Sequence, residues 1–306
     1  MIYYLLSFLI GIFATLLMLP MLRVIAFRIG MVSNENARSS HIGTVPNVGG
    51  MVMFIYAVAN ILFWSLHTEL QFSEMIRVNM SFICVAVMAV VGMIDDVRDI
   101  PAFVKLVIEI VVCSAYMIVV SRSVHLSMAV GVLIMLTIIN AYNLIDGIDG
   151  LALGILLTLS LSCAVCLSAS VLGSMLGIAI VLLIFNMFQD RWKVFLGDGG
   201  TLSIGFLLAV GLLKMDFVVD DSCGFAEWTM KYVDVSFKVL CCLSLPVIDM
   251  VRVALMRIIN HESPFKADRR HLHHILIDKG LPHWKATLLI VMANAIPIVI
   301  YDIYCT

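Results

Sequence analysis

Acidic residues stand at the ends of long apolar runs in this sequence. Asp95 and Asp96 directly follow the run Val78 to Ile94, and Asp99 lies about one helical turn further on. Adjacent carboxylates at a membrane surface repel each other unless a cation binds them. The group therefore predicts a metal or general-base site, although an interfacial stop built from turn-forming acids would give the same pattern.

The segment NAYNLIDGIDGL carries a second polar group. Asn140, Asn143, Asp146 and Asp149 recur at every third residue among mostly apolar neighbours. At about 100° per residue, such a stripe winds slowly around one half of a helix. Asx turns at a helix end explain one or two of these residues but not all four. The spacing favours a functional polar face.

The segment FNMFQDRWKVFLGDGGTL places Asn186 at the end of one apolar run and Asp198 just before the next, among Gly197, Gly199 and Gly200. Small residues let a backbone approach a phosphate or a metal closely. Asp198 is equally well placed to cap the helix that follows. Both roles remain open at this point.

The loop SPFKADRRHLHHILIDKG concentrates cationic and imidazole groups. They are Arg269, Arg270, His271, His273 and His274. A zinc site is disfavoured because no cysteine lies near and the arginines would oppose a cation, whereas Arg beside His suits a diphosphate. A solvated loop is the alternative.

One further acid, Asp249, lies inside an apolar run. Intramembrane acids are usually functional or paired. Arg252 follows three residues later, and an i,i+3 ion pair is the favoured interpretation.

The elements that must position these groups are membrane helices. The chain is 62% hydrophobic and only 13% charged, with a mean hydropathy of +1.08, whereas a soluble domain carries about 25% charged residues. The net charge is −2, so the chain lacks the excess of basic residues that is typical of nucleic-acid-binding proteins. We expect one domain, residues 1–306, folded as an all-α polytopic bundle of about ten transmembrane helices. The predicted spans are 2–22, 48–67, 77–94, 103–121, 124–142, 150–168, 170–188, 200–215, 236–256 and 286–303.

The basic residues orient this bundle. All but five of the 19 Lys and Arg fall on the side that also carries the polar groups above. The positive-inside rule places that side in the cytoplasm. Acids and amides there suggest Mg²⁺, with Mn²⁺ as an alternative, and the facing basic residues suggest an anionic substrate. Phosphoryl transfer needs this combination, and a lipid phosphate would serve as nucleophile.

Six segments together resemble a known family, the polyprenyl-phosphate N-acetylhexosamine-1-phosphate transferases, and most closely their bacterial WecA-type members that use UDP-GlcNAc and undecaprenyl phosphate. The segments lie between about residue 38 and residue 280, in the same order as in members of that family. They are SHIGTVPNVGG, GMIDDVRDIPAFVK, NAYNLIDGIDGL, FN with KVFLGDGGTLSIG, PVIDMVRV and SPFKADRRHLHHILI.

The resemblance implies transfer of a sugar 1-phosphate, with release of UMP, as the first membrane step of a cell-surface glycan. It implies that Asp198 and Asn143 hold Mg²⁺. It puts Asp95 and Asp96 beside the lipid phosphate as base or metal-orienting groups. The substrate-binding residues that it implies are Lys105, Asp146, Asp149, Asn186, Arg270, His271, His273, His274 and His41.

Two departures from the family pattern bear on the sugar. Ser40 stands where relatives often carry a basic residue, and GDGGT replaces a more usual GDAGS or GDTGS. The HLHH sequence resembles the GlcNAc type more than the muramoyl-pentapeptide branch. Another UDP-sugar, carrying GalNAc, a deoxy-amino sugar or muramoyl-pentapeptide, stays an alternative.

The resemblance also implies a location and partners. We expect a multi-pass protein of the bacterial cytoplasmic membrane, with its site facing the cytoplasm and membrane lipid around it. A homodimer is left open. A polytopic transporter is the alternative of a different class, but transporters place polar sites near the bilayer midplane and often show repeated halves.

Overall fold

Helices dominate the computed structural model, which describes residues 2–34, 43–66, 72–121, 126–162, 167–189, 191–213, 225–264 and 268–304. Because backbone groups in lipid must be satisfied within the segment, long apolar runs fold as helices. The helices are α1 (Ile2–Ile29), α2 (Gly49–Leu66), α3 (Phe72–Val97), α4 (Ala102–Ser121), α5 (Leu126–Ile145), α6 (Leu151–Ser160), α7 (Ala169–Met187), α8 (Gly197–Leu213), α9 (Phe225–Cys242), α10 (Ser244–Ile259), α11 (Leu272–Asp278) and α12 (His283–Tyr304). A short antiparallel ladder pairs β1 (Val32–Ser33) with β2 (Val45–Pro46).

The predicted all-α membrane bundle is confirmed, but the count of about ten spans is not. Within the described ranges, seven helices are long and apolar enough to cross a bilayer, or eight if the bent pair α9–α10 counts as one. α6 and α8 are apolar but shorter. Two predicted spans differ most: among its described residues, 150–168 is helical from Leu151 to Ser160, and 236–256 breaks at Leu243 with a bend of 95°.

The core of the bundle is α8. Every residue of this helix from Gly199 to Leu213 is buried, as expected for a helix that is apolar all round. It packs against α3, α5 and α2. Gly92 of α3 lies directly on the backbone of Asp198 and Gly199, and a side chain at Gly92 would overlap it. The start of α8 is therefore held against the end of α3.

The break between α9 and α10 is closed by a side chain from another helix. Asn294 of α12 is fully buried. Its Oδ1 accepts from Leu245 N and Ser244 Oγ, both at 3.2 Å, and its Nδ2 donates to Cys242 O at 2.9 Å. These bonds replace backbone bonds lost at the bend, which an apolar surrounding would otherwise leave unsatisfied. Asn294 thereby fixes the direction in which α10 leaves the bundle.

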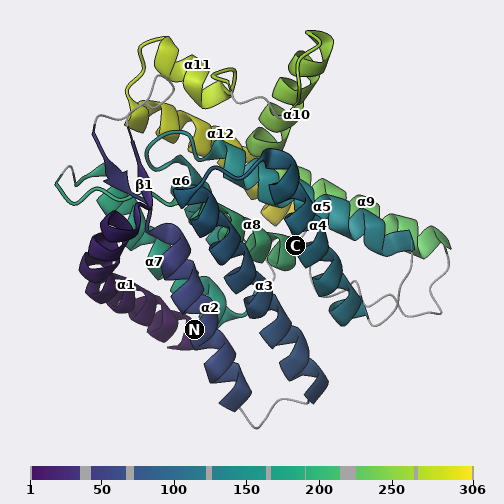
Figure 1. Cartoon of the computed structure of the whole chain (residues 1–306). Helices are drawn as coiled ribbons and strands as arrows, with labels where there is room; N and C mark the ends of the chain where they lie inside the picture. Colours follow the sequence, from purple (N-terminus) through teal and green to yellow (C-terminus); the bar gives the residue numbers. More distant parts are fainter. Residues whose placement is uncertain are drawn as a thin grey trace.

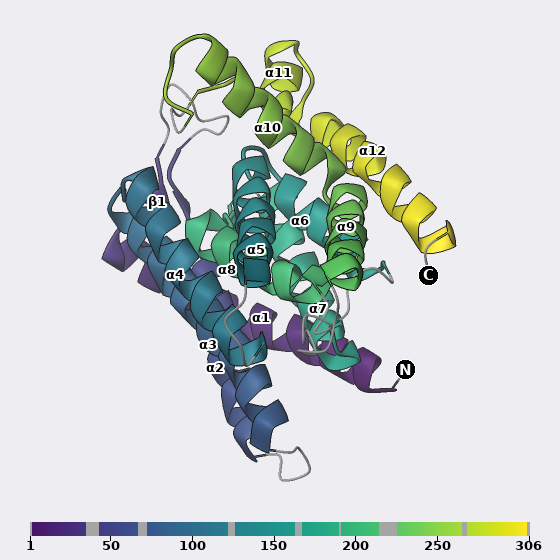
Figure 2. The ribbon, with the colours of Figure 1, turned by 90° about the vertical axis from the view of Figure 1, so that its right-hand side faces the viewer.

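The irregular elements gather at one end of the molecule. Figures 1 and 2 show β1, α10 and α11 at that end, while α2 and α3 extend away from it. Large apolar side chains such as Leu17, Leu133 and Ile303 are exposed on the outer helices, a surface that suits lipid tails.

Candidate functional site

A cavity of about 580 Å³ opens at the end of the bundle that carries β1 and α11, and residues of both elements line it. Six aspartates line it, from the ends of α3, α5 and α8 and from the turn before α6: Asp95, Asp96, Asp99, Asp146, Asp149 and Asp198. Asn47, Asn186 and His274 also line it. Segments far apart in sequence therefore meet in one acidic pocket.

Lys105 joins two of these acids. Its ammonium group bonds to Asp95 Oδ2 at 2.5 Å and to Asp198 Oδ2 at 2.6 Å. Ile100 N donates to Asp95 Oδ1 at 2.6 Å, which fixes the turn between α3 and α4. The side chains of Lys105 and Asp95 are only 17% and 9% exposed, whereas Asp198 is 34% exposed. Asp198 is thus the member of the group most open to a ligand.

Asp96 is bound differently from its neighbour. Its Oδ1 accepts from Asn47 Nδ2 at 2.7 Å and from Asp198 N at 3.0 Å, and its Oδ2 accepts from Gly199 N at 3.2 Å. All three donors are neutral. Asp96 therefore faces the first turn of α8 rather than a cationic side chain.

Asp146 has no hydrogen-bonding or ionic partner for its carboxylate within the described residues. Burial, together with the nearby carboxylates Asp96 and Asp149, raises the pKa of Asp146 to about 7. A half-buried acid without a partner, in a pocket of acids, marks a place where a cation is favourable.

Asp149 is bridged from two sides. Its Oδ2 lies 2.7 Å from Lys193 Nζ and 3.1 Å from His283 Nδ1. Although burial favours the neutral acid, hydrogen bonds to His283 and Lys193 hold the pKa of Asp149 below its usual value. Thr287 Oγ1 also donates to Asp149 O at 2.7 Å. Asp149 therefore ties the turn before α6 to α12 and to the loop before α8.

The two predicted amide residues, Asn143 as a metal ligand and Asn186 as a substrate-binding residue, have partners within the protein. Asn186 accepts from Gly150 N at 2.6 Å and donates to Val194 O at 3.0 Å, so it joins the turn before α6 to the loop before α8. Asn143 Oδ1 accepts from Thr201 Oγ1 at 2.7 Å. Asn186 lines the cavity, and Asn143 is not among the described residues that line it.

The segment from Asp268 to Gly280, called the histidine loop below, reaches the cavity through the ring of His274. His274 lines the pocket, and its buried Nδ1 has no hydrogen-bond partner among the described residues. His273 is 2% exposed and packs against Gly147, where a Cβ would collide with the ring. Burial, together with the neighbouring rings of His274 and His271, lowers the pKa of His273 to about 3. His273 therefore supports the loop as a neutral ring.

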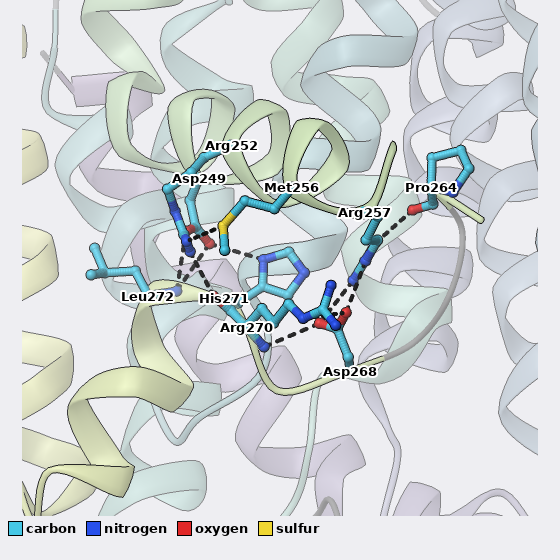
Figure 3. Close-up of polar contacts among 9 residues, drawn as sticks. All are labelled: Asp249, Arg252, Met256, Arg257, Pro264, Asp268, Arg270, His271 and Leu272. Atoms are coloured by element: carbon cyan, nitrogen blue, oxygen red, sulfur yellow. Dashed lines mark hydrogen bonds and ion pairs between the residues drawn. The ribbon is translucent and has the colours of Figure 1, made fainter. Parts of the chain in front are cut away.

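The loop is fastened to α10 by two ionic groups (Figure 3). Asp249 accepts from Leu272 N at 3.1 Å, and its Oδ2 lies 2.9 Å from His271 Nδ1. The expected pair with Arg252 is present at 2.6 Å, and the same Arg252 nitrogen donates to Arg270 O at 2.6 Å. Asp249 is therefore paired with Arg252, and it also attaches the histidine loop to α10.

The second fastening is Arg257. It donates to both oxygens of Asp268, at 3.0 and 3.1 Å, and to Pro264 O at 2.6 Å (Figure 3). The hydrogen bond from Arg257 lowers the pKa of Asp268 to about 2. Arg270 pairs with Glu262 at 2.8 Å and is not among the described residues that line the cavity.

The structure therefore places some of the predicted site residues at the cavity and others away from it. It brings Asp95, Asp96, Asp146, Asp149, Asp198, Asn186 and His274 to the cavity wall, with Lys105 between two of them. His41 lies outside the described residues. Sequence reasoning missed Asn47, Lys193 and His283 as partners of the acids. Asn47 stands in the segment PNVGG, and a polar residue two positions before a pair of glycines was the available signal.

The donor set fits a divalent cation that keeps part of its water shell. No three His, Cys, Asp or Glu side chains in the described ranges form a preformed metal cluster. Mg²⁺ rarely needs one, because it takes one or two carboxylates together with water and substrate phosphates. The partnerless Asp146 and the accessible Asp198 give the pocket that kind of surplus negative charge.

Comparisons with known proteins show which sequences this chain resembles. The family described as glycosyl transferase family 4 matches residues 78–216. An undecaprenyl-phosphate alpha-N-acetylglucosaminyl 1-phosphate transferase of Yersinia pestis is 29% identical over 90% of this chain and 77% of its own length. The protein of the same name from Salmonella typhi is 29% identical over 95% of this chain and 81% of its own length. A probable undecaprenyl-phosphate N-acetylglucosaminyl 1-phosphate transferase of Bacillus subtilis is 27% identical, over 95% and 82%.

Proposed function

We propose, on the premise that this chain is related to the family 4 glycosyl transferases, that it transfers N-acetylglucosamine 1-phosphate from UDP-GlcNAc to undecaprenyl phosphate. An oxygen of the lipid phosphate forms a bond to the sugar-bearing phosphorus, and the bond from that phosphorus to UMP breaks. The product is an undecaprenyl diphosphate sugar. The names of the relatives support undecaprenyl phosphate as the acceptor and N-acetylglucosamine 1-phosphate as the transferred group.

One observation carries the proposal: Lys105 bonds to Asp95 and Asp198 at the wall of an open acidic pocket, at one end of a bundle of apolar helices. Phosphoryl transfer requires positioning and charge neutralisation more than covalent chemistry. An ammonium group held between two acids can exchange one of them for a phosphate oxygen. Asp95 then faces the lipid phosphate, and His274 offers a ring nitrogen to the diphosphate.

The proposal includes Mg²⁺ held by Asp198, with Asp146 and Asn143 nearby. When bound, the cation neutralises phosphate charge that builds up during the transfer. Asp198 is suited to this because it is the most exposed member of the Lys105 group. Asn143 can contribute if its oxygen accepts a cation alongside Thr201. Mn²⁺ is the expected substitute.

The decisive assay measures UMP release by purified protein in detergent. We expect release from UDP-GlcNAc only when polyprenyl phosphate and Mg²⁺ are both present, with one equivalent of lipid-linked sugar found by mass spectrometry. Parallel reactions with UDP-GalNAc, a deoxy-amino UDP-sugar and UDP-muramoyl-pentapeptide identify the sugar. UMP release without lipid phosphate, or no transfer from any UDP-sugar, would contradict the proposal.

We also propose that the cavity faces the cytoplasm of a bacterial inner membrane. The excess of Lys and Arg on its side supports this orientation. Lys279 directly follows α11 and Glu74 is in the first turn of α3, and both are exposed. Figure 1 shows α11 and the start of α3 at opposite ends of the molecule. An impermeant thiol reagent should label Lys279→Cys only in inverted vesicles and Glu74→Cys only in intact cells. The reverse pattern would overturn the orientation.

A further inference from the structure

The two adjacent acids at the end of α3 differ in what they bind, and we propose that they do different work. We infer that Asp96 is a positioning residue. It caps the first turn of α8 and so holds Asp198 in place, while Asp95 alone of the two faces the reacting phosphates. This inference rests on the proposed function, which gives Asp198 its chemical role.

The contacts of the two carboxylates carry the distinction. Asp95 bonds to the ammonium group of Lys105, which it shares with Asp198. Asp96 receives three neutral donors instead, two of which are the backbone N–H groups of Asp198 and Gly199. A carboxylate has about four acceptor positions. Asp96 has filled three of them within the protein.

The start of α8 needs an acceptor from elsewhere in the chain. The first N–H groups of a helix have no partner inside it. The residues just before α8, Phe195 and Leu196, have apolar side chains and cannot supply one. The helix is buried from Gly199 onward, so water does not replace the missing bond. A carboxylate at this place is also stabilised by the helix dipole.

The surrounding backbone is shaped around Asp96. Gly92, one turn earlier on α3, lets the backbone of Gly199 lie directly against it. Gly197 adopts a φ of +68°, and a Cβ there would lie 2.6 Å from Asp96 Oδ2. Asn47 completes the arrangement, since it donates to Asp96 while its own Oδ1 accepts from Ser33 Oγ at 3.3 Å. Three segments therefore converge on this one carboxylate.

The test compares amide and methyl replacements at both acids. Asp96→Asn keeps an oxygen that accepts from Asn47 and Asp198 N, but it has no charge and no basicity. We expect it to lose about tenfold in kcat, as for one hydrogen bond to a charged group. Asp96→Ala removes every contact and should lose about a hundredfold or more. Asp95→Asn and Asp95→Ala should be equally impaired, because there the charge itself is needed.

Two further readouts separate positioning from chemistry. For Asp96→Asn the dependence of kcat on pH, from about pH 6 to 9, should keep the wild-type shape, whereas loss of a general base removes the acidic limb. The thermal midpoint should fall in the order wild type, Asp96→Asn, Asp96→Ala. If Asp96→Asn is as inactive as Asp96→Ala while remaining folded, or if its acidic limb disappears, Asp96 takes part in the chemistry and the inference fails.

Failure of the proposed function gives a different result. In that case wild-type protein transfers no sugar phosphate, yet the order of thermal midpoints still reports the cap. Equal midpoints for wild type and Asp96→Ala would show that α8 needs no acceptor from α3, whatever reaction the protein performs.

Discussion

The ammonium group of Lys105 lies 2.6 Å from Oδ2 of Asp198, although 93 residues separate the two in the chain. The same nitrogen also bonds to Asp95, so α3, α4 and α8 meet at one charge. Burying two acids this close together is costly without that cation. The relationship makes Lys105 both a structural link and the natural first contact for a substrate phosphate.

Replacement of Lys105 by Met should therefore affect folding and catalysis together. Breaking a mostly buried ion pair costs about 3–5 kcal/mol, and loss of one charge-stabilising contact lowers kcat by about a hundredfold or more. Steady-state assays and thermal unfolding in detergent measure the two effects. Lys105→Arg keeps the charge and should retain stability better than activity, because its planar group matches the site poorly. Wild-type kcat in Lys105→Met would remove this residue from the mechanism.

Replacement of Asp198 by Asn should remove most activity and raise the Mg²⁺ concentration needed for half-maximal rate. The amide keeps the shape of the side chain but loses the charge that attracts the cation. Titration of Mg²⁺ and Mn²⁺ against initial rate measures the shift, and chelation with EDTA should abolish wild-type turnover reversibly.

Asp234→Asn, a change at an exposed acid on α9, is the control and should leave the metal dependence unchanged. Turnover of Asp198→Asn at the wild-type rate, with the same metal requirement, would show that Asp198 does not bind the cation.

Replacement of Asp249 by Ala should loosen the histidine loop. Asp249 holds Leu272 N and His271 Nδ1, and through them the ring of His274 at the cavity. We expect KM for the UDP-sugar to rise by about tenfold, as for the loss of hydrogen bonds to a charged group, and limited proteolysis to cut the loop faster. The KM and the cleavage rate are measured on the same preparation.

A matched control lies on the same segment. Asp278 pairs with Arg269 at 2.7 Å but is 54% exposed, and exposed pairs contribute little. Asp278→Ala should leave both KM and cleavage close to wild type. If the two substitutions changed KM and the cleavage rate equally, the contacts of Asp249 would not be what keeps the histidine loop in place.

The sequence predicts which residues are polar in an apolar setting, and the structure decides what those residues bind. Asp95 and Asp198 were predicted to share a site because both follow or precede apolar runs on one side of the membrane. The use of Asp96 as a cap for α8 was not predictable, because a capping partner about a hundred residues away leaves no local pattern. The same holds for Asn186, whose amide bonds to two loops.

The predicted count of about ten spans is not confirmed, because the apolar runs at α6 and α8 form shorter helices, and an apolar run also does not show where a helix bends. Hydropathy reads a bent pair such as α9–α10 as one span, since the residues on both sides of Leu243 are apolar. Pro246 in the first turn of α10 was a local sign of a helix start. The bend itself depends on Asn294, which lies about fifty residues further on. Local composition does not contain that partner.

The buried ring of His273 should make the folded protein less stable at acid pH. This ring has a pKa of about 3 in the folded protein, against about 6.5 in an unfolded chain. Between these values the unfolded chain binds a proton that the folded protein does not. This ring should therefore leave the free energy of unfolding unchanged above about pH 6.5. Below that pH it should lower the free energy of unfolding by up to about 1.4 kcal/mol for each pH unit.

The thermal midpoint measured from pH 7.5 down to about pH 5 tests this. Replacement of His273 by Phe, a ring that does not titrate, should flatten the slope in this window even if the midpoint at pH 7.5 changes. His261 is exposed and has a φ of +56°, a conformation that Asn tolerates, so His261→Asn is the control and should keep the wild-type slope. If His273→Phe and wild type lose stability in parallel on acidification, another group carries the titration, because the neutral imidazole packed against Gly147 is the reason for expecting the difference.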